Sequence, residues 1–186
     1  MALIRPRDEP AETTIVPADI FLVDGALGVR ALPASSLVNN LFGTTTNDNA
    51  TAGNVGEYQS NSVASGSALA LSTGVTANLT SVILSAGDWD VWGQVLWTFG
   101  ATTNATVLDI GLSTSSATFP PLDGLSVMQW GNSGGQVLGA NPTAPVPPVR
   151  TRFSLSATTT VFLVVLAAFT VSTAKAFGSI QARRVR

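Results

Sequence analysis

Apolar and polar residues alternate with a period of two along much of the chain, and this period predicts β-strands rather than helices. The clearest alternation spans residues 88–99, where one face is apolar or glycine throughout. The opposite face begins with acidic residues and then carries Trp92 and Leu96. A large apolar pair on an outward face predicts a buried subunit interface. The inward face, assigned to the core, comprises Trp89, Val91, Gly93, Val95, Trp97 and Phe99.

Weaker strand patterns recur through the rest of the sequence, separated by turn residues. They lie at 67–72, 78–85, 106–113, 126–130, 152–156, 160–172 and 176–186. The glycine-rich segment 131–135 and the proline-rich segment 141–148 are interpreted as connections. No helical period of useful length appears. About eight strands in some 130 residues predict an all-β fold, an antiparallel jelly-roll-like β-sandwich preceded by an N-terminal hairpin or extended arm.

The longest apolar run, residues 161–169, is far shorter than the roughly 20 residues that a membrane-spanning helix needs. Its β-branched residues and its threonine-rich approach favour a strand buried on both faces. We therefore expect no membrane insertion. Phe162, Val164 and Leu166 of this run join Trp92 and Leu96 as the candidate residues of a trimer interface.

The first 42 residues are interpreted as an arm, residues 43–54 as a linker of small polar residues, and residues 55–186 as the sandwich domain. In the arm, two apolar segments flank the turn residues 24–28 and predict a hairpin. A lone hairpin is marginally stable in water, so the arm needs a surface to pack on, in its own trimer or on a docking partner. The candidate docking residues are Ile20, Phe21, Leu22, Val23, Val29 and Leu32.

Charged residues make up only 11% of the chain, against roughly 25% in an average soluble domain, so self-association is expected. The absence of cysteine excludes thiolate chemistry and cysteine-based zinc sites. The absence of histidine excludes an imidazole base and a Ser-His-Asp triad. The composition therefore favours assembly over catalysis and implies no cofactor.

The few charges are segregated along the chain. Residues 31–149 contain six acidic residues and no Lys or Arg, whereas residues 150–186 contain six basic residues and no acid. We expect the basic C-terminal strands to lie beside the acidic ones. Three terminal arginines in a chain of pI 4.8 are too few for a nucleic-acid footprint, so no nucleic-acid partner is expected.

The segment Ser85-Ala86-Gly87-Asp88-Trp89-Asp90-Val91-Trp92-Gly93 resembles the AGDWDVSG strand of small tailed-phage structural proteins. In that family the strand opens a β-sandwich, and the chain ends in a strand similar to residues 177–186. Residues 15–37 resemble the start of phage fibre and spike proteins, the end that anchors to the virion. The resemblance covers residues 15–37 and 78–97, and the C-terminus less closely, and leaves 100–149 unmatched. It implies a homotrimer whose sandwich binds a receptor or decorates a surface, with no catalytic residues.

Trp92 departs from the family pattern, which has a small residue at this position. A trimer that buries this position would therefore pack differently here. The alternative is that Trp92 is an exposed sugar-stacking platform.

Two other features allow more than one chemical interpretation. Asp88 and Asp90 share a strand face, which fits a solvated turn, a Ca²⁺ site or a glycosidase pair, and the solvated turn is favoured. Trp130, beside the glycine-rich segment, and Asn132 are the candidate glycan contacts, because binding residues concentrate next to flexible loops.

The sequence predicts a non-enzymatic phage virion protein, a tail or head fibre assembled as a homotrimer. Its arm would dock on another virion protein (tail, portal-proximal or coat), and its sandwich would face outward toward a host-cell glycan, where three weak sites gain avidity. The alternatives are a capsid decoration protein that stabilises the head shell and a lectin-like adhesion module. The N-terminus lacks the apolar core of a signal peptide, so synthesis in the host cytoplasm and incorporation into the virion are expected.

Overall fold

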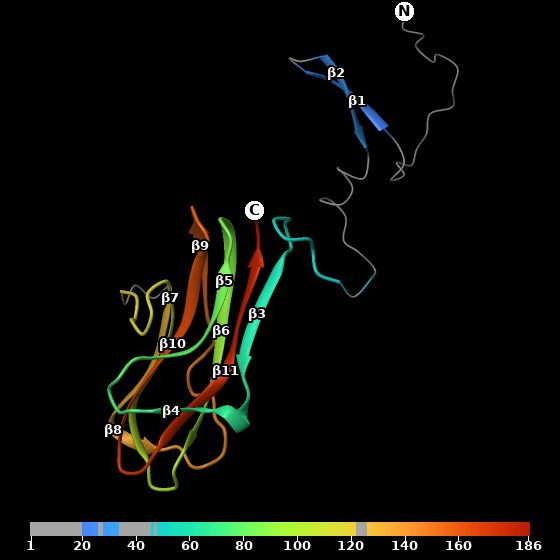
Figure 1. Ribbon diagram of the computed structural model, residues 1–186. Coiled ribbons are helices and arrows are strands. Elements are labelled where there is room, and N and C mark those ends of the chain that lie inside the picture. The colour runs from blue at the N-terminus through green and yellow to red at the C-terminus, as the bar shows by residue number, and fades with distance from the viewer. Residues whose placement is uncertain (1–19, 26–27, 34–45, 47, 122–125) are drawn as a thin grey trace, which may run out of the picture. The chain divides into compact units, whose positions relative to one another are not determined.

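The computed structural model describes residues 20–25, 28–33, 46, 48–121 and 126–186. Strands dominate these residues (Figure 1). The N-terminal strands are β1 (Ile20–Gly25) and β2 (Gly28–Pro33). The remaining strands are β3 (Tyr58–Val63), β4 (Leu69–Leu71), β5 (Ala77–Leu84), β6 (Gly87–Phe99), β7 (Asn104–Ser113), β8 (Val127–Val137), β9 (Val149–Leu155), β10 (Thr159–Thr170) and β11 (Ala174–Arg184). Within the described residues, no helix is long and apolar enough to cross a membrane.

The chain forms two compact units, residues 1–48 and 49–186. In the first unit, β1 and β2 pair antiparallel, from Ile20 opposite Pro33 to Gly25 opposite Gly28. The expected hairpin is therefore present. Gly25 and Gly28 flank the turn of this hairpin. Glycine is favoured there, because tight hairpin turns require backbone conformations that it adopts without strain.

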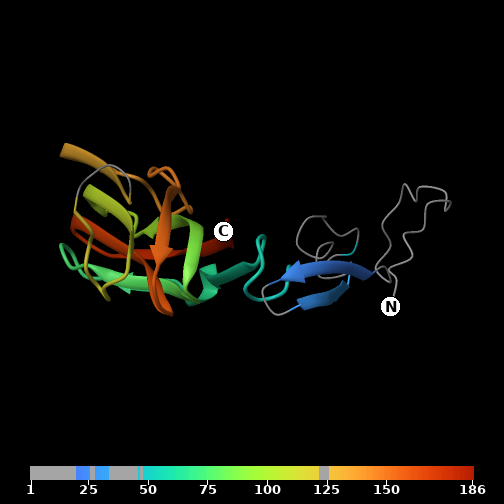
Figure 2. The same ribbon diagram turned by 90° about the horizontal axis from the view of Figure 1, so that it is seen from above.

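The second unit is a sandwich of two antiparallel sheets (Figures 1 and 2). One sheet has the order β5-β10-β7-β8, and the other has the order β3-β11-β6-β9, with β4 also paired to β11. If β3 is counted as the first of eight main strands and β4 is left out, the two orders become 2-7-4-5 and 1-8-3-6. These are the strand orders of a jelly roll, so the predicted fold class is confirmed.

The core lies between the sheets and uses the inward positions of the sequence pattern. Gly93 fills its inward position on β6 without a side chain, because Leu163 of β10 occupies the space that a Cβ would take. The apolar run on β10 contributes every second residue from Val161 to Ala167. All five predicted inward side chains of β6 are exposed by 4% or less: Trp89, Val91, Val95, Trp97 and Phe99.

The structure differs from the sequence prediction at three strands. Residues 58–63, for which no strand is predicted, form β3, whose four central residues are exposed polar side chains without apolar alternation. The predicted strand 126–130 continues to Val137, because the glycine-rich segment pairs with the start of β7 across a bulge. The predicted strand 67–72 shortens to β4, preceded by the single-turn 3₁₀ helix η1 (Ser65–Ser67).

The pairing of β6 with β11 runs from Phe99 opposite Ala174 to Trp89 opposite Arg184. It brings together the two segments of the sandwich domain that resemble phage structural proteins. Gly178 allows the strands to approach, since its φ is 153° and the backbone carbonyl of Gln94 occupies the position of a Cβ.

Candidate functional site

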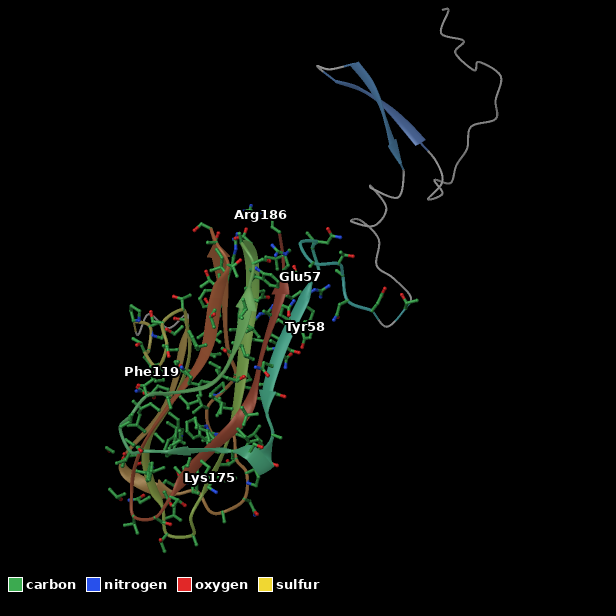
Figure 3. The ribbon with its side chains drawn as sticks, in the orientation of Figure 1. Glu57, Tyr58, Phe119, Lys175 and Arg186 are labelled. Atoms are coloured by element: carbon green, nitrogen blue, oxygen red, sulfur yellow. The ribbon has the colours of Figure 1, made fainter. Side chains whose placement is uncertain are left out.

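Most of the charged side chains of the sandwich gather at one end, which we call the ionic end. Arg152 Nη2 donates to Asp88 Oδ2 at 2.7 Å, and Arg186 Nη2 lies 2.8 Å from the same oxygen. Arg150 binds both carboxylate oxygens of Asp90, with its Nε 2.9 Å from Oδ1. The expectation that the basic C-terminal strands lie beside the acidic ones is confirmed. The ionic end comprises Glu57, Asp88, Asp90, Arg150, Arg152, Arg183, Arg184 and Arg186, and Figure 3 labels Glu57 and Arg186.

The two aspartates of the ionic end are held as anions. Ser154 and the Arg152 guanidinium hold the pKa of Asp88 below its ordinary value, and Arg150 does the same for Asp90. A glycosidase needs one carboxyl group with a raised pKa, and neither aspartate has one. Asp88 is 3% exposed, so the prediction of a solvated turn is wrong for this residue. Among the described residues, no three acidic, His or Cys side chains are grouped to hold a metal ion.

Arg184 is the buried cation of the ionic end, with a side chain 5% exposed. Its Nε donates to Glu57 Oε2 at 2.9 Å, and its Nη1 donates to the Ala86 carbonyl at 2.9 Å. Its Nη2 donates to Ser85 Oγ, and its guanidinium lies 4.4 Å from the ring centroid of Trp89. Arg184 therefore joins β11, the entry to β3 and the turn before β6.

Trp92 and Leu96 lie on the outer face of the β3-β11-β6-β9 sheet and are partly buried. Leu96 is opposite Phe177, and the ring centroid of Tyr58 lies 6.3 Å from that of Trp92. Sequence analysis does not single out Tyr58 or Phe177, although alternation along residues 176–186 places Phe177 opposite to the core side. We call this outer surface the aromatic face, defined by Tyr58, Trp92, Leu96 and Phe177. A recess of about 270 Å³ beside it is lined by Trp92, Pro148 and Arg150.

Phe162, Val164 and Leu166 lie on the outer face of the β5-β10-β7-β8 sheet, which we call the aliphatic face. The five candidate interface residues are thus divided between opposite faces of the sandwich. Val164 has no exposed surface, and Phe119 of the β7–β8 connection lies with it over Gly111. Val164 is therefore already covered within the chain and is not available to a partner subunit.

Asp109 lies on the same aliphatic face, opposite Leu166 of β10 and Gln129 of β8. It is 9% exposed. Gln129 Nε2 donates to its Oδ2 at 3.3 Å, and its Oδ1 has no hydrogen-bond partner in the described part of the chain. Burial raises the pKa of Asp109, and the bond from Gln129 offsets only part of this effect.

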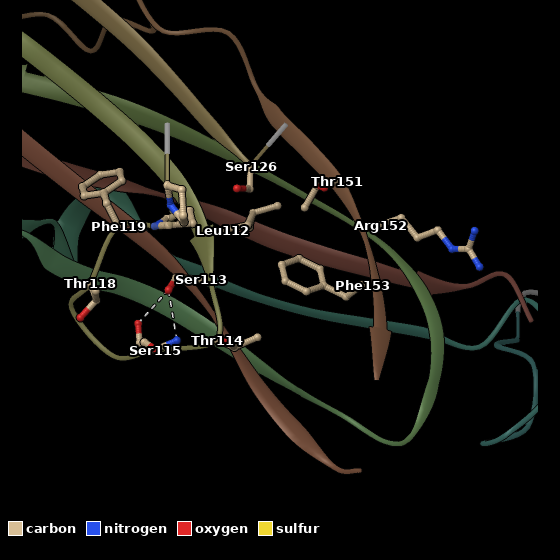
Figure 4. A pocket seen from close by; sticks show the side chains of 12 residues that line it. Leu112, Ser113, Thr114, Ser115, Thr118, Phe119, Ser126, Thr151, Arg152 and Phe153 are labelled. Atoms are coloured by element: carbon tan, nitrogen blue, oxygen red, sulfur yellow. Dashed lines mark hydrogen bonds between the residues drawn. The ribbon is translucent and has the colours of Figure 1, made fainter. Parts of the chain in front are cut away.

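A recess of about 540 Å³ opens at the sandwich edge between β7 and β9 (Figure 4). Phe153 points into it toward the side of Leu112, whereas Arg152 points away. Ser113 Oγ accepts the Ser115 N–H at 3.1 Å. Its lining residues are apolar or hydroxyl-bearing apart from Arg152, with no carboxylate among them, so the recess offers contact surface rather than acid–base chemistry.

The predicted glycan contacts lie on strand β8. Trp130, opposite Leu108, is partly buried and packs against the core. Asn132 Oδ1 accepts the Gly134 N–H at 3.1 Å. The segment expected to be a flexible loop is part of strand β8, so proximity to a loop no longer supports Trp130 and Asn132 as glycan contacts. Their role in glycan binding stays a prediction.

The predicted docking residues of the arm lie in the hairpin strands, and their side chains lie outside the described part of the structure. β1 contains Ile20, Phe21, Leu22 and Val23, and β2 contains Val29 and Leu32.

No family model and no curated protein matches the chain by sequence. Its structure is similar to that of chains in three solved structures of one virus. They are infectious bursal disease virus of the Gx strain (15% identity, TM-score 0.42), the VP2 subviral particle of that virus (12%, 0.43) and its Gt strain (12%, 0.37). The matches cover 77%, 90% and 89% of this chain, but only 36–38% of the other chains.

Replacing Arg184 by Met should lower the free energy of unfolding at pH 7 by about 3–5 kcal/mol, because it leaves Glu57 buried without its partner. Burial raises the pKa of Glu57, but bonds from the Gly53 N–H and Arg184 outweigh it and hold that pKa below 4.5. The stabilisation is therefore present above pH 4.5 and is lost as the pH falls through the folded-state value. Urea denaturation at several pH values measures both effects.

The matched control is Arg183→Met, the exposed neighbour on β11, which should change stability by less than about 0.5 kcal/mol. Equal losses in the two variants would contradict the role assigned to the buried pair.

Replacing Asp109 by Asn should raise the free energy of unfolding at pH 7. The raised pKa means that the folded chain binds this proton more tightly than the unfolded chain does. Ionisation at neutral pH thus costs stability, and the cost disappears as the pH falls below 3.8. In urea denaturation, the free energy of unfolding of the variant should exceed that of wild type at pH 7 and equal it near pH 3. A less stable variant at pH 7 would show that the carboxylate is held by a donor.

Proposed function

We propose that this chain is a non-enzymatic virion structural protein of a tailed phage, a tail or head fibre subunit. The arm, residues 1–42, docks on another virion protein through the apolar hairpin strands. The sandwich, residues 55–186, faces outward and attaches to the host surface. The protein is made in the host cytoplasm and resides in the virion.

The observation that carries this proposal is the pairing of β6 with β11. The two segments that resemble phage structural proteins, residues 85–93 and 177–186, are adjacent strands of one sheet, and Arg184 of one stacks on Trp89 of the other. The two segments are far apart in the sequence but pack together as one unit. A shared fold requires that such segments be kept together. Its residues serve packing, which agrees with a structural role.

The ionic end supports a role without catalysis. Asp88 and Asp90 are the candidate carboxylate pair for glycoside cleavage. Arginines hold both as anions, so neither can donate a proton to a leaving group at neutral pH.

For the homotrimer, we assign the subunit interface to the aromatic face, which includes Trp92 and Leu96. The chain covers part of its aliphatic face with its own Phe119. On the aromatic face, the Arg150 guanidinium lies 5.9 Å from the ring centroid of Trp92, but the Arg150 side chain is itself 68% exposed. Interface cores are enriched in Trp, Tyr and Phe, the side chains that this face presents. Phe162 and Leu166 then lie on the opposite face, away from this interface.

A capsid decoration protein is the second candidate, and the aliphatic face is the observation that favours it. Ile83 of β5 is 68% exposed there, opposite Thr160 of β10, and the partly buried Phe162 and Leu166 follow on the same face further along β10. An exposed apolar surface of this kind suits a clamp between coat subunits.

Labelled antibody and electron microscopy of purified particles test the proposed function. A fibre should give signal at the tail or at isolated projections, with a few dozen copies at most, and its loss should reduce adsorption. Signal over the whole head, with shells weakened by its loss, would establish the decoration protein instead. Absence from particles would leave a lectin-like adhesion module.

Replacing Trp92 by Ser should shift the protein from trimer toward monomer in sedimentation velocity, because it removes the largest side chain of the aromatic face. Phe162→Ser is the matched control on the aliphatic face and should leave the trimer intact. Dissociation by Phe162→Ser alone would place the interface on the other sheet.

A further inference from the structure

The end of the sandwich opposite the ionic end, which we call the far end, is nearly without charge. Figure 3 shows Lys175 at this end and Glu57 and Arg186 at the other. Four segments converge there, residues 64–77, 97–107, 131–147 and 166–178. These four segments together contain a single charged residue, Lys175, and its side chain is exposed.

The turn between β10 and β11 at the far end is strained. Val171 and Ser172 stand at φ 58° and 64°, in the left-handed region that β-branched residues avoid. Val171 is also 66% exposed, so no burial compensates for its conformation. Strained residues that packing does not require are typical of functional surfaces.

Hydrogen bonds from the neighbouring loop hold this turn in place. The Gly100 N–H and the Thr103 hydroxyl both donate to the Thr173 carbonyl, at 2.9 and 2.8 Å. The Ser172 side chain lies over Gly100, where a Cβ would clash with it. The turn is therefore built into a fixed shape.

The β4–β5 connection is tied to β10 in the same way. The Thr73 hydroxyl donates to the Phe169 carbonyl and accepts the Phe169 N–H, both at 2.9 Å. The Gly74 N–H donates to the Ala167 carbonyl at 2.8 Å. A surface held by such cross-links loses little freedom when it binds, which favours affinity.

The exposed chemistry of the far end combines methyl groups, hydroxyls and a single ammonium group. Val75, Val137 and Val171 are 55–66% exposed, and the hydroxyl-bearing residues Thr102 and Ser172 are exposed at the same end. Methyl groups match the C–H surfaces of sugar rings, and hydroxyls exchange hydrogen bonds with sugar hydroxyls. The single positive charge of the ammonium group balances the single negative charge of a carboxylate, whereas a phosphate monoester carries nearly two negative charges.

We propose that the far end, through the Val171–Thr173 turn and Lys175, binds a carboxylate-bearing polysaccharide of the host cell surface. This inference rests on the proposed attachment function and names its site and ligand class. In a homotrimer, three copies of the site point to the same ligand surface, so weak single contacts add as avidity.

The test is binding of the full-length protein to an array of bacterial surface polysaccharides with uronic acid-containing, neutral and phosphorylated members. Wild type should prefer the uronic acid members and lose affinity as salt rises. Lys175→Gln should weaken that binding by about tenfold or more, since every copy in the trimer loses the same contact. Val185→Asn, at an exposed valine of the ionic end, is the matched control and should bind like wild type.

The double variant Val171→Asn/Ser172→Gly separates binding from folding. Asn-Gly favours a turn with positive φ at both positions, so this variant should unfold at a higher temperature than wild type while it binds less. Unchanged binding in both far-end variants would overturn the site and leave the attachment function standing. A wild type that prefers neutral or phosphorylated members, or that binds none while particles still adsorb through the protein, would overturn the ligand class.

Discussion

One buried cation fixes how the sandwich closes. Burying a guanidinium is costly unless its donors find acceptors and its charge finds an anion. Arg184 meets both conditions with Glu57, the Ala86 carbonyl and Ser85, while Trp89 covers its face. A one-residue slip of β11 against β6 would move Arg184 to the other face of the sheet and remove every partner. The register of the central strand pair, and with it the position of Gly178 against Gln94, is thus set at this end.

The same arrangement separates the tasks of the two ends. The remaining ion pairs, of Asp88 with Arg152 and Arg186 and of Asp90 with Arg150, lie at the same end as Arg184. Electrostatic stabilisation is therefore concentrated where the chain enters β3 and leaves β11. The far end contributes no ion pair among the described residues. Its loops can therefore carry exposed valines and a strained turn at Val171, because the stability of the fold is supplied elsewhere.

Sequence periodicity predicts the strands that have one buried face and fails for those that do not. β6 is predicted well because burial of one face forces apolar residues onto alternate positions, whereas β10 is predicted from a continuous apolar run. β3 has exposed polar residues at its centre, so nothing in its sequence separates it from a loop. The glycine-rich part of β8 is predicted as a connection, not as a strand. Strand formation there depends on pairing with Asn104 and Ala105, which is a tertiary contact. The sequence pattern does not predict the burial of Asp88 either, because the arginines that pair with it are more than 60 residues away along the chain.

Closure of the proposed trimer would place a geometric demand on the aromatic face. In a ring, each subunit uses two different surfaces, and these must be inclined to each other for the ring to close. The aromatic and aliphatic faces point in opposite directions, so contact between them would stack copies in a row. A closed trimer would instead bring the aromatic face against a neighbouring edge. The edge between β7 and β9 borders the sheet of that face, and its open recess combines Phe119 and Phe153 with hydroxyl-bearing residues, so it offers Trp92 and Phe177 a mixed apolar and polar surface.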